Sequence, residues 1–170
     1  LRNQFGLVIS ASHNNYLDNG IKLFAGTGEK ISKDAEKKIE KLLAGDLKPV
    51  KTAELGKAQR FDESGDRYIE FCKSTVPADV SFESLRIVLD CANGACYKVS
   101  PSILRELGAE VISIGADPDG YNINSECGST HPEKAQEEVV KQRADFGIAL
   151  DGDGDRVVLI DRNGNILDGD

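Results

Sequence analysis

Short apolar runs alternate with amphipathic stretches over the second half of the chain. Residues 85–89 form a near-continuous apolar run, which is typical of a strand covered on both faces. The predicted elements are, in order, strand 85–89, helix 95–107, strand 110–114, helix 132–143, strand 146–150 and a hairpin over 156–167. This order predicts an α/β fold with a mixed, mainly parallel sheet that is flanked by helices. Loops after its strands, at Asp90 and at Asp151, are expected at the edge where ligands bind.

The first part of the chain has a simpler pattern. Short strands are predicted at 7–9 and 21–24, with a polar segment between them. Ser32 is expected to cap a helix of about 12 residues whose apolar side chains share one face. A second helix is predicted at 66–73, after a connection with weak periodicity. Pro101, within the later predicted helix 95–107, indicates a kink there or a later start.

Composition narrows the class of protein by exclusion. The 170 residues include 21 basic and 29 acidic side chains, a formal net charge of −8. This balance argues against broad electrostatic binding to nucleic acid or to an anionic membrane. Apolar runs of the ~20 residues that span a bilayer are absent from the sequence. Four cysteines without a Cys-x-x-Cys pair favour free thiols and a cytoplasmic location. Both ends suggest a piece of a longer chain.

The densest acidic segment is Asp151-Gly152-Asp153-Gly154-Asp155-Arg156. Three carboxylates at alternate positions, with glycine between them, can converge on one hard cation. A solvated acidic turn is the alternative interpretation. An EF-hand loop is excluded because Arg156 and Arg162 stand where that loop needs Gly and Glu. A haloacid-dehalogenase-type phosphatase motif is excluded because Asp155 replaces its Thr.

A second polar segment, Ser10-Ala11-Ser12-His13-Asn14, follows the first predicted strand. Its composition alone indicates a loop at the end of a strand. Adjacent Ser12 and His13 do not make a hydrolase triad, and the Gly-x-Ser-x-Gly motif is absent from the sequence. The nearby Asp18-Asn19-Gly20-Ile21-Lys22 is, on its own, a turn followed by an exposed lysine.

Together these segments resemble a known family. Ser10–Asn14, followed by Tyr16 and Asp18–Lys22, resembles the active-site serine segment of the α-D-phosphohexomutases. Asp151–Arg156 resembles the metal-binding loop of that family. Two further stretches, 89–95 and 122–131, are similar to the branch of the family that acts on glucosamine phosphates.

The resemblance covers the whole chain and implies its domain organisation. Residues 1–60 correspond to the C-terminal part of domain 1 of a phosphohexomutase, and residues 61–170 correspond to domain 2. The loops of the family that recognise the sugar and the distal phosphate lie in domains 3 and 4, and neither appears here. One departure is Asn15, which stands where the family usually has Pro and leaves the rigidity of the loop in question.

The resemblance also implies a reaction for the complete enzyme. Glucosamine 6-phosphate and glucosamine 1-phosphate would be interconverted through a bisphosphorylated sugar, with the phosphoryl group carried by a serine that matches Ser12. Mg²⁺ would be bound by that phosphoserine and by three aspartates that match Asp151, Asp153 and Asp155. His13 and Asn14 would flank the phosphate. Arg156 would contact it, and Lys22 matches a proposed general acid/base.

These roles agree with the chemistry of phosphoryl transfer. Phosphoryl transfer depends on positioning and on neutralising charge. A serine phosphate carries about −1.5 to −2 charges at neutral pH, so beside three aspartates it needs a divalent cation. Two alternatives stay open at this point: a phosphomannomutase or phosphoglucomutase of the same superfamily, and a non-catalytic α/β module that binds Mg²⁺ or Ca²⁺. An open sheet edge can also pair with a second copy, which leaves a homodimer as a candidate assembly.

Overall fold

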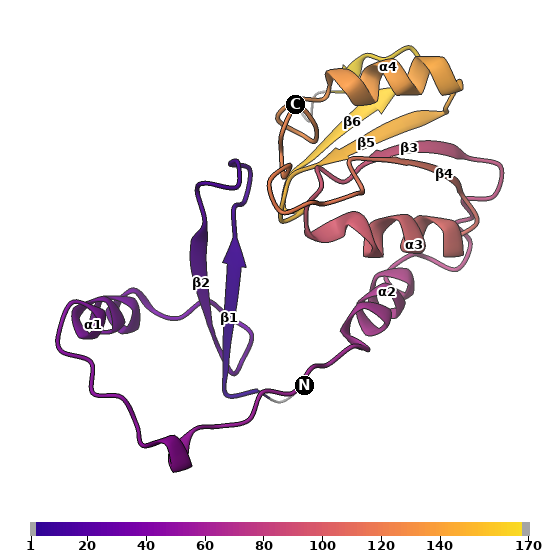
Figure 1. The fold of residues 1–170 in the computed structure, drawn as a ribbon. Coiled ribbons are helices and arrows are strands. Elements are labelled where there is room, and N and C mark those ends of the chain that lie inside the picture. Colours follow the sequence, from indigo (N-terminus) through magenta and orange to yellow (C-terminus); the bar gives the residue numbers. More distant parts are fainter. Residues whose placement is uncertain (1–2, 168–170) are drawn as a thin grey trace. The chain divides into compact units, whose positions relative to one another are not determined.

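The chain forms two compact units (Figure 1). The computed structural model describes residues 3–167. The first unit holds the described residues up to Ile9 together with Ile21–Phe61, and the second holds Ser10–Gly20 together with the residues from Asp62 onward.

The first unit is small and open. Strands β1 (Phe5–Ser10) and β2 (Gly20–Ala25) hydrogen bond to one another in a two-stranded sheet, as the strand–loop–strand pattern predicts. Helix α1 (Lys33–Leu43) begins after Ser32, whose Oγ accepts a hydrogen bond from the Ala35 N–H at 3.3 Å. The predicted N-cap is therefore confirmed. A short 3₁₀ turn, Thr52–Glu54, lies in the connection that follows.

The second unit is built on a five-stranded sheet with the order β4-β3-β5-β6-β7. The strands are β3 (Arg86–Asp90), β4 (Glu110–Ile114), β5 (Phe146–Leu150), β6 (Val157–Asp161) and β7 (Ile166–Leu167). β3 pairs in parallel with both β4 and β5, so it lies inside the sheet, whereas β6 and β7 continue it with antiparallel pairs. The predicted α/β fold with a mixed sheet is confirmed.

Helices cover both faces of this sheet (Figure 1). They are α2 (Ser64–Ser74), α3 (Val99–Glu106) and α4 (Glu133–Gln142). α4 packs on β3, β5 and β6, α3 contacts β4 on the opposite face, and α2 packs against α3. The buried core between α4 and the sheet consists of Val88, Ala135, Val139, Ala144, Ala149 and Ile160.

Pro101 sets where α3 begins. A 3₁₀ turn at Ala95–Tyr97 comes first, and the α-helix starts only at Val99, which places Pro101 in its first turn. Proline is tolerated there because the first N–H groups of a helix have no acceptor within it. The later start, rather than a kink, is the correct one of the two predicted outcomes. Gly108 follows the helix with φ +106°, as a terminating glycine does.

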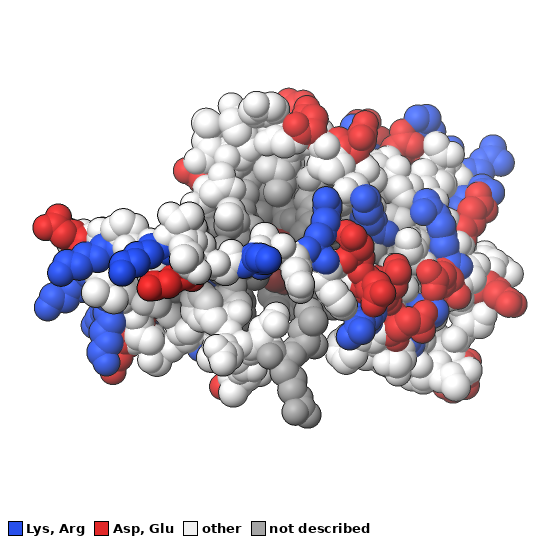
Figure 2. All heavy atoms as spheres, turned by 60° about the horizontal axis from the view of Figure 1, so that its bottom comes forward, with Lys and Arg blue, Asp and Glu red and all other residues white. Residues whose placement is uncertain are grey.

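The described surface carries charged side chains of both signs together with exposed apolar side chains. On the face shown in Figure 2, acidic and basic side chains are interspersed. The helices among residues 3–167 are all too short or too polar to cross a membrane. All four cysteines are free thiols, with Cys91 and Cys127 buried.

Candidate metal and phosphate site

The three aspartates predicted as metal ligands converge in the loop between β5 and β6. Asp151 is fully buried, Asp153 is half-buried and Asp155 is exposed. Each offers one carboxylate oxygen, and these oxygens all lie within 4.8 Å of one another. Such a group of oxygen donors matches the ligands that hard divalent cations take in proteins.

Asp151 organises this loop. Its Oδ1 accepts hydrogen bonds from the backbone N–H groups of Asp155 and Arg156, each at 3.1 Å. Its Oδ2 is buried, and no described residue donates a hydrogen bond to it. An ionised oxygen buried without a partner is costly. A cation held among the three carboxylates would compensate for that cost, so the residues present fit a divalent metal ion.

The segment that contains Ser12 lies against the aspartate loop. Ser10 Oγ donates a hydrogen bond to Oδ2 of Asp153 at 2.9 Å, although the two residues are 143 positions apart in the sequence. The same Ser10 Oγ accepts a hydrogen bond from the Ser12 N–H at 2.9 Å. One hydroxyl group therefore joins the two predicted segments, and both belong to the second compact unit.

Ser12 itself adopts a left-handed backbone conformation, with φ +52°. This region is uncommon for a residue with a side chain, and it is found at turns and at functional sites. The Asn14 N–H donates to the Ala11 carbonyl at 2.9 Å and closes the turn around Ser12. Ser12 Oγ and His13 Nδ1 are 3.4 Å apart, a long hydrogen bond, and both side chains are half-buried.

Gly152 allows the two segments to touch. A Cβ atom at this position would collide with the Ser12 carbonyl oxygen, and it would come within 2.7 Å of Asn124 Nδ2. The Gly152 carbonyl accepts a hydrogen bond from the Ala95 N–H at 2.8 Å, which ties the aspartate loop to the loop that follows β3. The loops after β3 and β5 therefore meet at one edge of the sheet, as the parallel order predicts.

Asn124 contacts the serine segment but was not among the residues predicted for the site. Its Nδ2 donates hydrogen bonds to the carbonyl oxygens of Ser12 and Asn14, at 2.8 and 2.7 Å. The only signal in the sequence is its position in the stretch 122–131, which the family resemblance singles out. Periodicity gives no indication that this loop reaches residues more than 100 positions earlier.

Two further predicted residues occupy different places. Arg156 has an exposed side chain, and its backbone N–H is one of the two that hold Asp151. Lys22 is half-buried on β2 and belongs to the first compact unit, so it is not among the residues that the second unit brings together.

A thiol lies beside the aspartate loop. A Cβ atom at Gly154, which has φ +72°, would collide with Cys96 Sγ. Burial raises the pKa of the Cys96 thiol, and the nearby carboxylates of Asp151 and Asp153 raise that pKa further, although a hydrogen bond with Ser100 opposes them.

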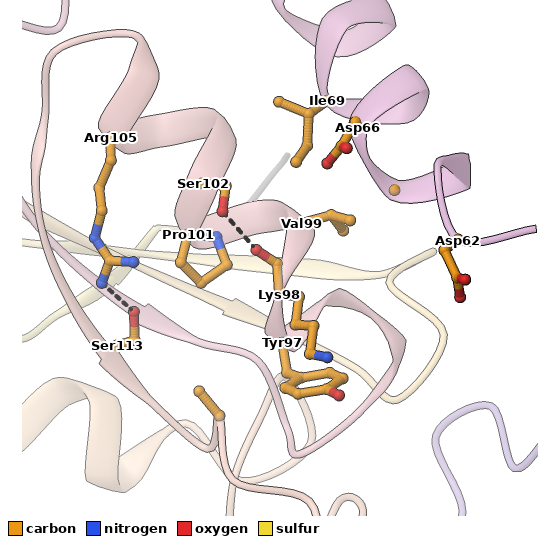
Figure 3. Close-up of a pocket in the computed structure, with 12 residues that line it drawn as sticks. Asp62, Asp66, Ile69, Tyr97, Lys98, Val99, Pro101, Ser102, Arg105 and Ser113 are labelled. Carbon is orange, nitrogen blue, oxygen red and sulfur yellow. Dashed lines mark hydrogen bonds between the residues drawn. The ribbon is translucent and has the colours of Figure 1, made fainter.

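A separate cavity of about 580 Å³ lies between α2, α3 and β4 (Figure 3). Asp66, Lys98 and Arg105 are among its lining residues. Ser102 Oγ donates to the Lys98 carbonyl, and the Arg105 guanidinium donates to Ser113 Oγ and to the Val111 carbonyl. The lining of this cavity includes none of the predicted site residues.

Comparison with protein families gives two matches along the chain. Residues 66–164 match a family model described as phosphoglucomutase/phosphomannomutase, alpha/beta/alpha domain II. Residues 1–49 match the model described as alpha/beta/alpha domain I of the same family. The domain II match alone covers more than half of the chain.

Comparison with individual proteins gives similar results. A phosphoglucosamine mutase of Bradyrhizobium sp. (strain ORS 278) is 59% identical over 172 residues, which cover 100% of this chain and 38% of that protein. The crystal structure of a putative phosphomannomutase from Thermus thermophilus has a TM-score of 0.81 at 24% identity, covering 99% of this chain and 39% of that one. N-acetylphosphoglucosamine mutase from Aspergillus fumigatus, solved with GlcNAc-6P and magnesium, has a TM-score of 0.67 at 19% identity, covering 96% of this chain and 45% of that one.

Proposed function

The chain belongs to the phosphoglucomutase/phosphomannomutase family, the α-D-phosphohexomutases, and from this premise we propose that it forms the phosphoserine and metal-binding part of a phosphoglucosamine mutase. The complete enzyme would interconvert glucosamine 6-phosphate and glucosamine 1-phosphate. The chain spans about two fifths of the curated relatives it matches, 38% of the first of them. We further propose that residues 1–60 are the end of domain 1 and that 61–170 are most of domain 2.

The observation that carries this proposal is the junction between the serine segment and the aspartate loop. Ser10 Oγ binds both the Ser12 N–H and the Asp153 carboxylate. This arrangement suits a serine that bears a phosphate next to a metal ion, because the phosphate and the three carboxylates then share one cation. The choice of glucosamine phosphate over other sugar phosphates rests on the names of the similar relatives.

The proposed reaction has two phosphoryl transfers. In the first, the bond between Ser12 Oγ and phosphorus breaks, and a bond from phosphorus to a sugar hydroxyl oxygen forms. Lys22, in its neutral form, would accept the hydroxyl proton, and a proton would pass back through solvent to Ser12 Oγ, so that no proton is gained or lost overall. The resulting bisphosphorylated sugar turns round, and its other phosphoryl group returns to Ser12 Oγ by the reverse exchange.

The remaining residues would position and neutralise the phosphate. Mg²⁺, held by Asp151, Asp153 and Asp155, would supply a Lewis acid that neutralises charge on the transferred group. His13 and Asn14 flank Ser12 in the chain and would border its phosphate, and the exposed Arg156 side chain would bind a phosphate oxygen. A cytoplasmic location and a homodimer stay predictions.

The decisive experiment is substitution of the serine in the complete protein. Mass spectrometry of the wild type should find one phosphoryl group, mapped to Ser12. Ser12→Ala should abolish both this group and mutase activity, because it removes the oxygen atom that carries the phosphoryl group. Ser125→Ala, at an exposed serine, is the matched control and should keep both. Full activity in Ser12→Ala would refute the proposal.

A panel of sugar phosphates tests the substrate. Glucosamine 6-phosphate should be the best substrate of the complete protein. Faster turnover of mannose or glucose phosphates would instead assign it to the other branches of the family. Metal binding without any phosphoryl transfer would favour the non-catalytic module.

The metal site is tested by titrating the protein with MgCl₂ in a calorimeter. Asp151→Asn should weaken Mg²⁺ binding by about tenfold or more, because it replaces the buried carboxylate with a neutral amide. Asp79→Asn makes the same change of charge at an exposed residue outside the site and should leave binding unchanged. Equal affinity in the two variants would exclude Asp151 as a ligand.

A further inference from the structure

Asn124 lies where the loop between β4 and α4 touches the serine segment. The residue is only 7% exposed. Its single side-chain nitrogen donates to two backbone carbonyls, those of Ser12 and Asn14, which lie on either side of His13. These contacts bridge 112 and 110 positions of the sequence, so they fix the serine segment relative to a distant part of the chain.

The geometry fixes the orientation of this amide. Both groups facing Nδ2 are carbonyl oxygens, so rotating the amide by half a turn would place Oδ1 against two acceptors. No donor among the described residues faces Oδ1. The side chain therefore acts through its two N–H groups, and both of them hold the serine segment.

The contact also reaches the aspartate loop. A Cβ atom at Gly152 would lie 2.7 Å from Asn124 Nδ2 and would collide with the Ser12 carbonyl oxygen. The amide, the Ser12 carbonyl and the backbone between Asp151 and Asp153 are thus packed together. A shift of the amide would change the distance between Ser12 and the three carboxylates.

Asn124 is itself held firmly. Its backbone has φ +54°, and its N–H donates to the Ala92 carbonyl at 2.9 Å. The same loop is anchored to the buried carboxylate of Asp90, which accepts a hydrogen bond from the Gly128 N–H at 2.8 Å. The chain of contacts runs from the end of β3, through the loop of Asn124, to the Ser12 carbonyl.

From these contacts we propose that Asn124 is a positioning residue, which sets the placement of the Ser12 hydroxyl, and of a phosphate on it, relative to the aspartate cluster. This inference deepens the proposed function and rests on it. Ser12 has a left-handed backbone, so without the two hydrogen bonds its segment can relax toward commoner conformations. Misplacement of a reacting group by about 1 Å can cost on the order of 100-fold in rate.

The test compares two asparagines of one loop in the complete protein. Asn124→Ala removes the two hydrogen bonds to the serine segment. Asn122→Ala is the matched control, because among residues 3–167 the Asn122 side chain bonds only within its own loop, to the Asp117 carbonyl and the Asp119 N–H. Asn124→Ser keeps one donor in a smaller side chain and serves as the milder variant.

Asn124→Ala should lower kcat by about 100-fold while KM for glucosamine 6-phosphate stays within about threefold of the Asn122→Ala value. Asn124→Ser should give an intermediate kcat. The ³¹P NMR shift of the Ser12 phosphate should respond to MgCl₂ in the wild type and in Asn122→Ala, and this response should be smaller in both Asn124 variants. A purely structural role would not change that response in protein that stays folded.

The outcomes separate this inference from the proposed function. A wild type without phosphate on Ser12 contradicts the proposed function and removes the basis of the inference with it. A phosphorylated, active wild type, with Asn124 variants that match Asn122→Ala in kcat and in ³¹P response, overturns the inference alone. If Asn124→Ala fails to fold, Asn124→Ser decides, and a wild-type kcat in that variant also overturns the inference.

Discussion

At the scale of single residues, the site depends on a few side chains that make two contacts each. Ser10 Oγ accepts from Ser12 and donates to Asp153. Asp151 Oδ1 accepts hydrogen bonds from two backbone N–H groups, while its buried Oδ2 has no donor among the described residues. Asp90 is buried in the same way, but its two oxygens accept hydrogen bonds from Ala92 and Gly128. Asp90 therefore has both oxygens satisfied within the fold, whereas Asp151 has one buried oxygen without a donor among the described residues, which is the oxygen proposed to bind the metal ion.

A single buried thiol, that of Cys91, makes the stability of the protein depend on pH. Burial raises the pKa of Cys91 to about 12, above the ordinary value of 9.0. Because the folded-state pKa is raised, the stabilisation is fully present below about pH 9 and is lost as the pH rises toward 12. Between pH 8 and pH 10 this thiol should lower the free energy of unfolding by about 1.4 kcal/mol.

Urea denaturation at the two pH values, for the wild type and for Cys91→Ala, measures this effect. The substitution lowers stability at both pH values, but the loss between them should be smaller in the variant. Subtracting the variant's pH dependence from that of the wild type cancels other titrating groups. An identical pH dependence in the two proteins would contradict the assignment.

At the scale of elements, the ends of parallel strands bring loops together, and glycine lets them touch. β3 and β5 are parallel neighbours, so the loops that follow them meet at one edge of the sheet. The Ala95 N–H bonds to the Gly152 carbonyl at this edge. The Ser12 carbonyl oxygen and Asn124 Nδ2 both lie close to the Gly152 Cα, where a side chain would have to stand. A larger residue at position 152 would therefore displace the serine segment, the loop of Asn124 or the aspartate loop itself.

Gly152→Ala should therefore destabilise the second unit by about 1–3 kcal/mol, the usual cost of overpacking. Gly65→Ala is the matched control, because a Cβ there would make an ordinary contact of 3.9 Å with Val99 Cγ1, within helix α2. This control should be neutral or slightly stabilising, since alanine is the better helix former. Chemical denaturation of both variants measures the difference, and equal stabilities would show that the loops separate without cost.

At the scale of the whole molecule, the two units differ in how much buried core stabilises each of them. The second unit has a core with fully buried residues such as Val88, Val139 and Ile160. In the first unit no described residue is buried, and its sheet has two strands. A two-stranded sheet without a buried face is at best marginally stable on its own.

Hydrogen exchange of the 170-residue chain should separate the two units. Backbone amides of β3 and β5 are expected to be strongly protected, because they lie in the core of the second unit. Amides of α1 and of the connection that follows it should exchange much faster. Similar protection in α1 and in β5, measured by mass spectrometry of peptides, would show that the first unit is stabilised by contacts that burial does not reveal.

Local patterns in the sequence determined much of this protein. Apolar periodicity predicts the order of strands and helices, because each element's buried face repeats with its own period. The aspartate loop and the serine segment are also local, since their chemistry lies in a few adjacent residues. Family resemblance then connects the two segments and assigns their residues to roles, which stay proposals until they are measured.

The tertiary structure alone decided how those segments are joined. Ser10 reaches Asp153 across 143 positions, and Asn124 reaches Ser12 across 112. No periodicity records such pairs, because hydrogen bonds between loops depend on where the chain folds back and not on spacing. For the same reason the role of Gly152 could not be predicted. In the sequence it is one glycine of a loop, whereas in the fold it lies where the aspartate loop touches the serine segment and the loop of Asn124.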